Sequence, residues 1–127
     1  MAGSGRLFGT LAHVSSTTVK RGSTMRGISR AASDIEPHAS HAAGLLKALA
    51  NEQRLMILCY LSDRELSVGE LNELVPLSQS ALSQHLAVLR ESGVVRTSRE
   101  AQSIRYSLPR GVVTDIIGAL KKEYCGR

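Results

Sequence analysis

The sequence predicts one small domain made mainly of α-helices, about five of them, together with a two-stranded β-hairpin. Apolar residues recur at helical spacing through most of residues 36–92. Between residues 94 and 108 the period changes to an alternation of apolar and polar side chains, and from about Gly111 the helical period returns. A chain of 127 residues has room for one domain rather than two.

Two helices are predicted first. One runs from about Glu36 to Ala50, and Pro37 fits its first turn. Asn51 is a good N-cap for a second helix from Glu52 to about Leu61. After Arg54 this second helix is apolar on nearly all sides, so we expect it to lie at the centre of the domain.

The next two helices are bounded by their own start and stop signals. Ser67 and Glu70 have the spacing of a capping box, which opens a short third helix that Pro76 ends. Ser78 caps a fourth helix, which runs to about Ser92, and Gly93 ends it.

The hairpin follows the fourth helix. Residues 94–99 predict one strand, residues 104–108 a second, and residues 100–103 the connection between them. The last helix begins near Gly111 and ends near Cys125. Two helices joined by a tight turn and followed by a β-hairpin are the pattern of a winged helix-turn-helix, so this is the fold that the sequence predicts.

The net charge of +5 lies entirely in the N-terminal segment. Residues 1–33 carry five basic side chains and no acidic one, whereas residues 34–127 carry 11 of each sign. We therefore expect residues 1–35 to be a disordered basic tail and residues 36–127 to be the folded domain. Met25 is an alternative start of the chain within this tail. The overall charge is no indication that the folded domain binds DNA.

Several classes of protein are excluded by composition and motifs. The longest apolar run, Leu55–Leu61, is far shorter than the roughly 20 residues of a membrane span. Two cysteines exclude a disulfide-dense scaffold and a four-cysteine zinc site. The sequence contains no glycine-rich phosphate loop, nucleophile elbow or zinc-protease motif. We expect a cytoplasmic protein that is not an enzyme and carries no cofactor.

A surface for double-stranded DNA is predicted on the fourth helix and the hairpin. One face of the helix is an apolar stripe, and the opposite face carries small and amide side chains that suit the major groove: Ser78, Gln79, Ser80, Ser83 and Gln84. The hairpin side chains predicted to meet the flanking backbone or the minor groove are Arg96, Arg99, Gln102 and Arg105. The alternatives are a solvated helix face and a charged hairpin edge that discourages aggregation. His85 borders the apolar stripe, and we expect it to be packed and hydrogen-bonded.

Three stretches of the sequence closely resemble the ArsR/SmtB family of bacterial repressors: Leu45–Arg54, Ile57–Leu61 and Ser78–Glu91. The resemblance covers about residues 36–125. It implies a homodimer formed through the first and last helices, a palindromic operator, and release of the DNA when an inducer is sensed.

The metal sites known in that family are not matched here. One class has Cys-Val-Cys at the start of the third helix, where this chain has Ser67 and Gly69. Another class has Asp-x-His on the last helix, where Asp115 is followed at that spacing by Ile117. Both sites lack their soft or imidazole ligands, so metal sensing of these kinds is not expected.

Cys59 and Cys125, 66 positions apart, resemble the cysteine pair of the dithiol, persulfide- and redox-sensing branch of the family, the BigR/SqrR/HlyU-like branch. The resemblance implies that reactive sulfur species or oxidants bridge the two cysteines. We expect Cys125 to be attacked first, because Lys121 and Lys122 are near it in sequence, and Cys59 to resolve the product. The alternatives are a metal-responsive repressor with Cys59 and Cys125 as ligands, a thiol enzyme, and a protein-interaction module.

Overall fold

The computed structural model describes residues 30–126. Most of the predicted tail, including Met25, lies outside these residues, so the disorder expected there stays a prediction. The six tail residues that are described form a helix, α2 (Arg30–Ile35), which is followed by a 3-10 turn, η1 (Glu36–His38). The chain divides into two compact units between Pro37 and His38.

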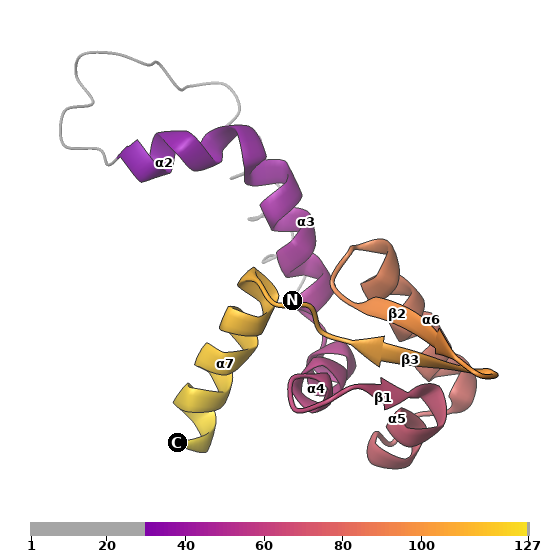
Figure 1. The fold of residues 1–127 in the computed structure, drawn as a ribbon. Coiled ribbons are helices and arrows are strands. Elements are labelled where there is room, and N and C mark those ends of the chain that lie inside the picture. The colour runs from indigo at the N-terminus through magenta and orange to yellow at the C-terminus, as the bar shows by residue number, and fades with distance from the viewer. Residues whose placement is uncertain (1–29, 127) are drawn as a thin grey trace, which may run out of the picture. The chain divides into compact units, whose positions relative to one another are not determined.

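The second unit contains the predicted elements except the start of the first helix, which was predicted from about Glu36 but begins at Ala39, after the 3-10 turn that contains Glu36 and Pro37. Its helices are α3 (Ala39–Leu49), α4 (Glu52–Leu61), α5 (Val68–Leu74), α6 (Gln79–Glu91) and α7 (Val112–Cys125). Its strands are β1 (Leu66–Ser67), β2 (Arg96–Glu100) and β3 (Ser103–Ser107), which form an antiparallel sheet in the order β1-β3-β2 (Figure 1). The prediction of five helices with a hairpin is confirmed, and the structure adds a third strand.

Three helices begin where the capping signals predicted. The side chain of Asn51 accepts hydrogen bonds from the backbone N–H groups of Gln53 and Arg54, both at 3.0 Å. In the capping box, the N–H of Glu70 donates to Ser67 Oγ at 3.1 Å, and the N–H of Ser67 donates to the Glu70 carboxylate at 2.9 Å. Each bond satisfies a backbone donor that the helix itself leaves unpaired.

The first hairpin strand begins two residues later than the sequence predicted. Val94 and Val95 are buried, and their N–H groups both donate to the carbonyl of Leu89, at 2.9 and 3.4 Å. They therefore belong to the turn that closes α6, in which Gly93 has a φ of 74°. The prediction of a strand from Val94 was wrong because these two β-branched residues pack in the core and do not pair with a neighbouring strand.

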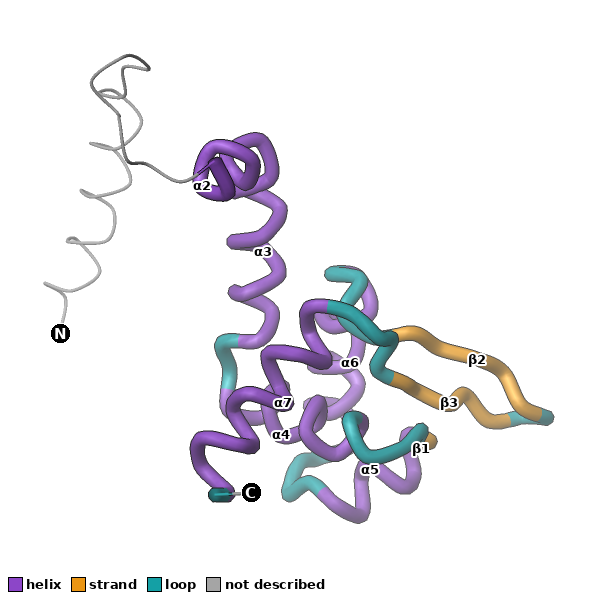
Figure 2. The backbone as a smooth tube through the Cα atoms, turned by 60° about the vertical axis from the view of Figure 1, so that its left-hand side comes forward, coloured by secondary structure: helices purple, strands orange, loops and turns teal. Residues whose placement is uncertain are grey.

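The hairpin is anchored to the helices through β1. Leu66 pairs with Tyr106, and both side chains are buried in the core. The free end of the hairpin projects beyond the helices (Figure 2). Its turn is Ala101–Gln102, shorter than the predicted connection because Glu100 and Ser103 pair as strand residues. Ala101 has a φ of 57°, in the region that glycine prefers.

The core centres on α4, as predicted, and its buried side chains are aliphatic apart from Tyr106. Ile57 and Leu58 of α4 are completely buried, and α4 contacts α3, α6 and α7. Residues from the other helices and from the sheet complete one continuous cluster, among them Leu71, Leu82, Leu86, Leu89, Tyr106 and Ile117. Within residues 30–126, no helix is both long enough and apolar enough to cross a membrane.

Candidate functional site: a DNA-binding surface and a cysteine pair

The polar face predicted on α6 is exposed along its whole length. Leu82, Leu86 and Leu89 are buried against the core, which fixes the rotation of the helix about its axis. The exposed side chains opposite them are Ser78, Gln79, Ser80, Ser83 and Gln84. The hydroxyl of Ser78 also caps the helix, because it accepts the N–H of Ala81 at 3.1 Å. The helix therefore presents both amide side chains and its own N-terminus to an incoming ligand.

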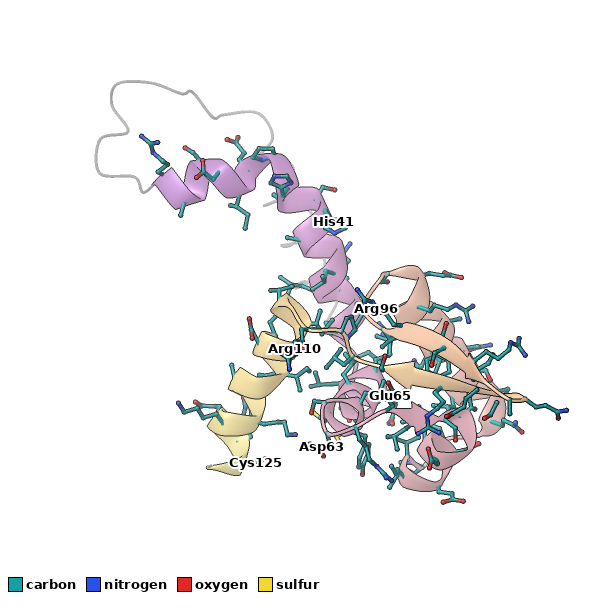
Figure 3. All side chains as sticks on the ribbon, viewed as in Figure 1. His41, Asp63, Glu65, Arg96, Arg110 and Cys125 are labelled. Carbon is teal, nitrogen blue, oxygen red and sulfur yellow. The ribbon has the colours of Figure 1, made fainter. Side chains whose placement is uncertain are left out.

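Three of the four predicted hairpin residues are exposed in the same way. Arg96 lies at the start of β2 (Figure 3), Arg99 lies further along the same strand, and Gln102 is in the turn. No ion pair involving Arg96 or Arg99 is found among the residues that the structure describes. Both guanidinium groups are thus available for phosphate oxygens.

Arg105 differs from the other hairpin residues because three carboxylates surround it. Its guanidinium lies 3.6 Å from Glu65, 3.6 Å from Glu70 and 3.5 Å from Glu100, and it donates to the carbonyl of Glu65 at 3.2 Å. Its side chain is 26% exposed. Arg105 therefore ties β3 to the segment that carries β1 and the start of α5, and its charge is largely compensated before any DNA arrives.

This difference predicts unlike effects of two substitutions. Arg99→Met is expected to weaken binding to any duplex and to lower the slope of log K against log salt by about 0.9 for each phosphate that the side chain no longer neutralises. Arg105→Met is expected to leave that slope nearly unchanged and to lower the melting temperature instead. Fluorescence anisotropy with a labelled duplex at salt concentrations between about 50 and 200 mM, together with thermal denaturation, measures both. An equal fall in slope for the two variants would contradict this assignment.

Arg54 joins three helices at the base of α6. Its Nε donates to the carbonyl of Ala48 at 2.6 Å and its Nη2 to that of Lys47 at 3.4 Å, so it satisfies carbonyls at the end of α3. Its Nη1 lies 3.5 Å from Nδ1 of His85 on α6. His85 is half-buried, and the expectation of a packed, hydrogen-bonded histidine is confirmed.

The two cysteines belong to the α4–α7 pair of helices. Cys59 is half-buried near the end of α4, Cys125 is exposed at the end of α7, and both thiols are free. Burial raises the pKa of the Cys59 thiol above its usual value. The Lys121 ammonium lowers this pKa, whereas the negative charges of Cys125 and Asp63 raise it further. The helices that carry the two cysteines, α4 and α7, contact each other.

Lys121 connects these two helix ends. Its Nζ donates to Ser62 Oγ and to the carboxylate of Asp63, each at 3.0 Å, and Ser62 Oγ donates to the carbonyl of Cys59 at 2.7 Å. Asp63 lies two residues after the end of α4, and Cys125 is the last residue of α7; both are labelled in Figure 3. The sequence placed Lys121 four residues before Cys125 and so on the same helix face, but it gave no signal for the partners Ser62 and Asp63.

In the part of the chain that the structure describes, the cysteine pair has no third metal ligand beside it. Among residues 30–126, no group of three or more His, Cys, Asp or Glu side chains is arranged to hold an ion. The two positions that carry thiolates in one metal-sensing class are here Ser67, which is committed to the capping box, and Gly69.

A helix with an exposed polar face, followed by a basic hairpin, defines a winged helix-turn-helix DNA-binding protein. The comparisons with known proteins agree, because residues 51–97 match the family described as "Bacterial regulatory protein, arsR family". The chain belongs to the ArsR family of bacterial transcriptional regulators, which are DNA-binding proteins rather than enzymes. Four of its relatives, HlyU, BigR, NolR and YgaV, belong to the BigR/HlyU branch of that family.

Three relatives illustrate the similarity. The chain is 53% identical to the transcriptional activator HlyU of Vibrio cholerae over 92 residues, which are 72% of this chain and 85% of that protein. The structure of reduced HlyU from Vibrio cholerae matches with a TM-score of 0.68 and covers 72% of this chain and 97% of its own. The structure of the transcriptional repressor BigR from Xylella fastidiosa matches with the same TM-score at 40% identity, over 79% of this chain and all of its own.

Proposed function

We propose that this regulator is a repressor that binds a palindromic operator as a homodimer and leaves it when Cys59 and Cys125 become bridged. The inducer would be a reactive sulfur species, a persulfide or polysulfide, or an oxidant. The observation that carries the proposal is the presence of two free thiols on α4 and α7, two helices that contact each other and that Lys121 joins through Ser62 and Asp63. The repressor role is supported by the similarity to BigR, which is a transcriptional repressor.

Contact with DNA would involve α6 and the hairpin together. The exposed serines and glutamines of α6 would enter the major groove, where glutamine can bond to adenine with both of its polar atoms. Arg96, Arg99 and Gln102 would contact the backbone or minor groove beside it. Arg105 would act mainly by holding the hairpin in place, because its carboxylate neighbours already occupy its guanidinium.

The homodimer would use α3 and α7. These helices expose large apolar side chains, of which Leu46 on α3 is 53% exposed, while Val112 and Tyr124 on α7 are 58% and 81% exposed. Apolar side chains gathered on two helices favour an interface over a free surface. A two-fold axis would place the two α6 helices in half-sites about one turn of DNA apart.

Bridging would proceed by thiol exchange. Cys125 is exposed, and its thiolate would attack the sulfane sulfur of the persulfide or polysulfide; the S–S bond of the inducer breaks, a thiolate or shorter polysulfide leaves, and a persulfide forms on Cys125. The Cys59 thiolate then attacks the inner sulfur of that persulfide, a disulfide forms between the two residues, and hydrosulfide leaves with the electron pair. The raised pKa of Cys59 makes its thiolate scarce at neutral pH but also intrinsically more nucleophilic once it is formed.

The free energy of such a bridge is sufficient for a switch. A bond between Cys59 and Cys125 closes a loop of the chain. The lost entropy of the unfolded chain corresponds to a stabilisation of about 4 kcal/mol for the form that the bond fits. Allosteric coupling between two sites usually amounts to about 1–3 kcal/mol. A bond that fits only one arrangement of α4 and α7 would therefore shift the protein to a form that does not bind DNA.

The test is release of a DNA duplex that contains the operator, located by footprinting upstream of the chain's own gene. Polysulfide is expected to release the native protein, while Cys59→Ser and Cys125→Ser retain DNA affinity and stay bound after the same treatment. Intact mass spectrometry of the treated native protein distinguishes the disulfide, which adds no sulfur, from a longer sulfur bridge, in which added sulfur atoms remain. Release of either serine variant by polysulfide would overturn the proposal.

A further inference from the structure

The contacts of Lys121 make it the main polar link between the end of α7 and the end of α4. Its ammonium bonds to both Ser62 and Asp63, the two residues that follow α4 directly. The Ser62 hydroxyl turns back to the carbonyl of Cys59. A single side chain thus joins the turn that begins three residues after Cys59 to the turn that ends at Cys125.

We propose that Lys121 is a positioning residue for the cysteine pair: it holds the last turn of α7 against the end of α4, which keeps Cys125 within reach of Cys59. This inference rests on the proposed function, because it concerns the formation of the same bridge. Cys125 lies in the final turn of its helix, where fraying is ordinarily greatest. Without an anchor one turn earlier, this thiol would spend more of its time away from Cys59.

The same side chain also acts on the Cys59 sulfur through its charge. Among residues 30–126, the charged groups that shift the pKa of this thiol are Lys121, Cys125 and Asp63, and of these Lys121 is the positive one. A nearby cation stabilises the thiolate, which is the reacting form. Asp63 has the opposite effect on the sulfur, although it is the partner that holds Lys121 in place.

Lys122 provides a matched control on the neighbouring position of the same helix. It carries the same charge but is exposed, and within residues 30–126 the polar contacts between α7 and the end of α4 come from Lys121 instead. Lys121→Met and Lys122→Met therefore change the net charge of the protein equally. Only the former removes the link between the two helices.

The first measurement is the equilibrium between the full-length protein and a glutathione redox buffer. Each protein molecule passes two electrons and two protons to one glutathione disulfide, which yields the Cys59–Cys125 disulfide and two glutathione thiols. Lys121→Met is expected to lower the equilibrium constant about two- to five-fold, in keeping with the modest strength of a partly exposed ion pair. Lys122→Met is expected to leave it unchanged.

The second measurement separates the anchor from the charge, and it does not require a bridge. In a Cys125→Ser background, the rate at which iodoacetamide alkylates Cys59 is followed against pH. Lys121→Met should move this profile to higher pH, because a stabilising cation is lost, whereas Asp63→Asn should move it to lower pH. In the two-cysteine protein, Asp63→Asn should still weaken bridging, because the ion pair is broken.

The results distinguish this inference from the proposed function. Equal bridging constants for Lys121→Met, Lys122→Met and the native chain, or an unmoved alkylation profile for Lys121→Met, would overturn the inference and leave the switch standing. If the native protein bridged normally but stayed on DNA, the proposed function would fail while the two measurements still tested Lys121.

Discussion

Replacing Leu82 with alanine is expected to lower the free energy of unfolding by about 2–5 kcal/mol, the usual cost of a cavity in a well-packed core. Leu82 is completely buried, and it holds α6 against the rest of the domain from the side opposite the predicted DNA contacts. The melting temperature should fall by about 4–8 °C for each kcal/mol in a domain of this size. Chemical denaturation followed by circular dichroism measures the change directly.

Two further variants on α6 serve as controls for this effect. Leu82→Met keeps the volume of the side chain and should cost less than about 1.5 kcal/mol. Gln84→Ala lies on the exposed face and should change stability by no more than about 0.5 kcal/mol, while it weakens DNA binding. All variants are compared at one protein concentration, because association would otherwise alter the apparent stability. A Leu82→Ala protein as stable as Leu82→Met would show that α6 is not packed as described.

Replacing Arg54 with methionine is expected to lower the free energy of unfolding by about 2 kcal/mol, because hydrogen bonds from a charged donor contribute about 1.5–3 kcal/mol each. The substitution removes the donor to the carbonyl of Ala48, whose residue is buried, and leaves His85 without this partner. Since His85 lies on α6, weaker DNA binding should accompany the lower stability. Urea denaturation and anisotropy with a labelled duplex measure the two effects.

Arg54→Lys is also expected to lower the free energy of unfolding. The single ammonium of lysine cannot reach the two α3 carbonyls and His85 in the forked geometry of a guanidinium. The matched control is Glu52→Gln in the first turn of the same helix, an exposed side chain whose replacement should have little effect. If Arg54→Lys were as stable as the native chain, the fork of contacts would not be the reason for the stability of this junction.

The sequence was most informative where local chemistry decides the structure. The helix starts after Asn51, Ser67 and Ser78 were predicted to the residue, because a capping side chain bonds within its own first turn. The hairpin was predicted from its alternating second strand. The start of its first strand was wrongly predicted at Val94. Burial of Val94 and Val95 by residues distant in sequence determines the path of the chain there, and sequence periodicity carries no information about such contacts.

The contacts that shape the candidate site could not be predicted, since they join residues far apart in sequence. The strand β1 has only two residues and therefore no alternation to detect. In the sequence, nothing distinguishes Arg105 from Arg96 and Arg99. The difference arises from the fold, which brings Glu65, 40 positions away, beside Arg105. The contact of Lys121 with Asp63 spans 58 positions. In each case the residue type was visible in the sequence, but its partner was not.

The short strand β1 also limits how this protein can respond to a signal. Ser67 is both its last residue and the N-cap of α5, and β1 pairs with β3 of the hairpin. The sheet thus joins the hairpin to the helix-turn-helix within each chain. Under the proposed function, a bridge at the ends of α4 and α7 in a symmetric pair of chains would act on the spacing and tilt between the two α6 helices, and so on their match to the pitch of the double helix.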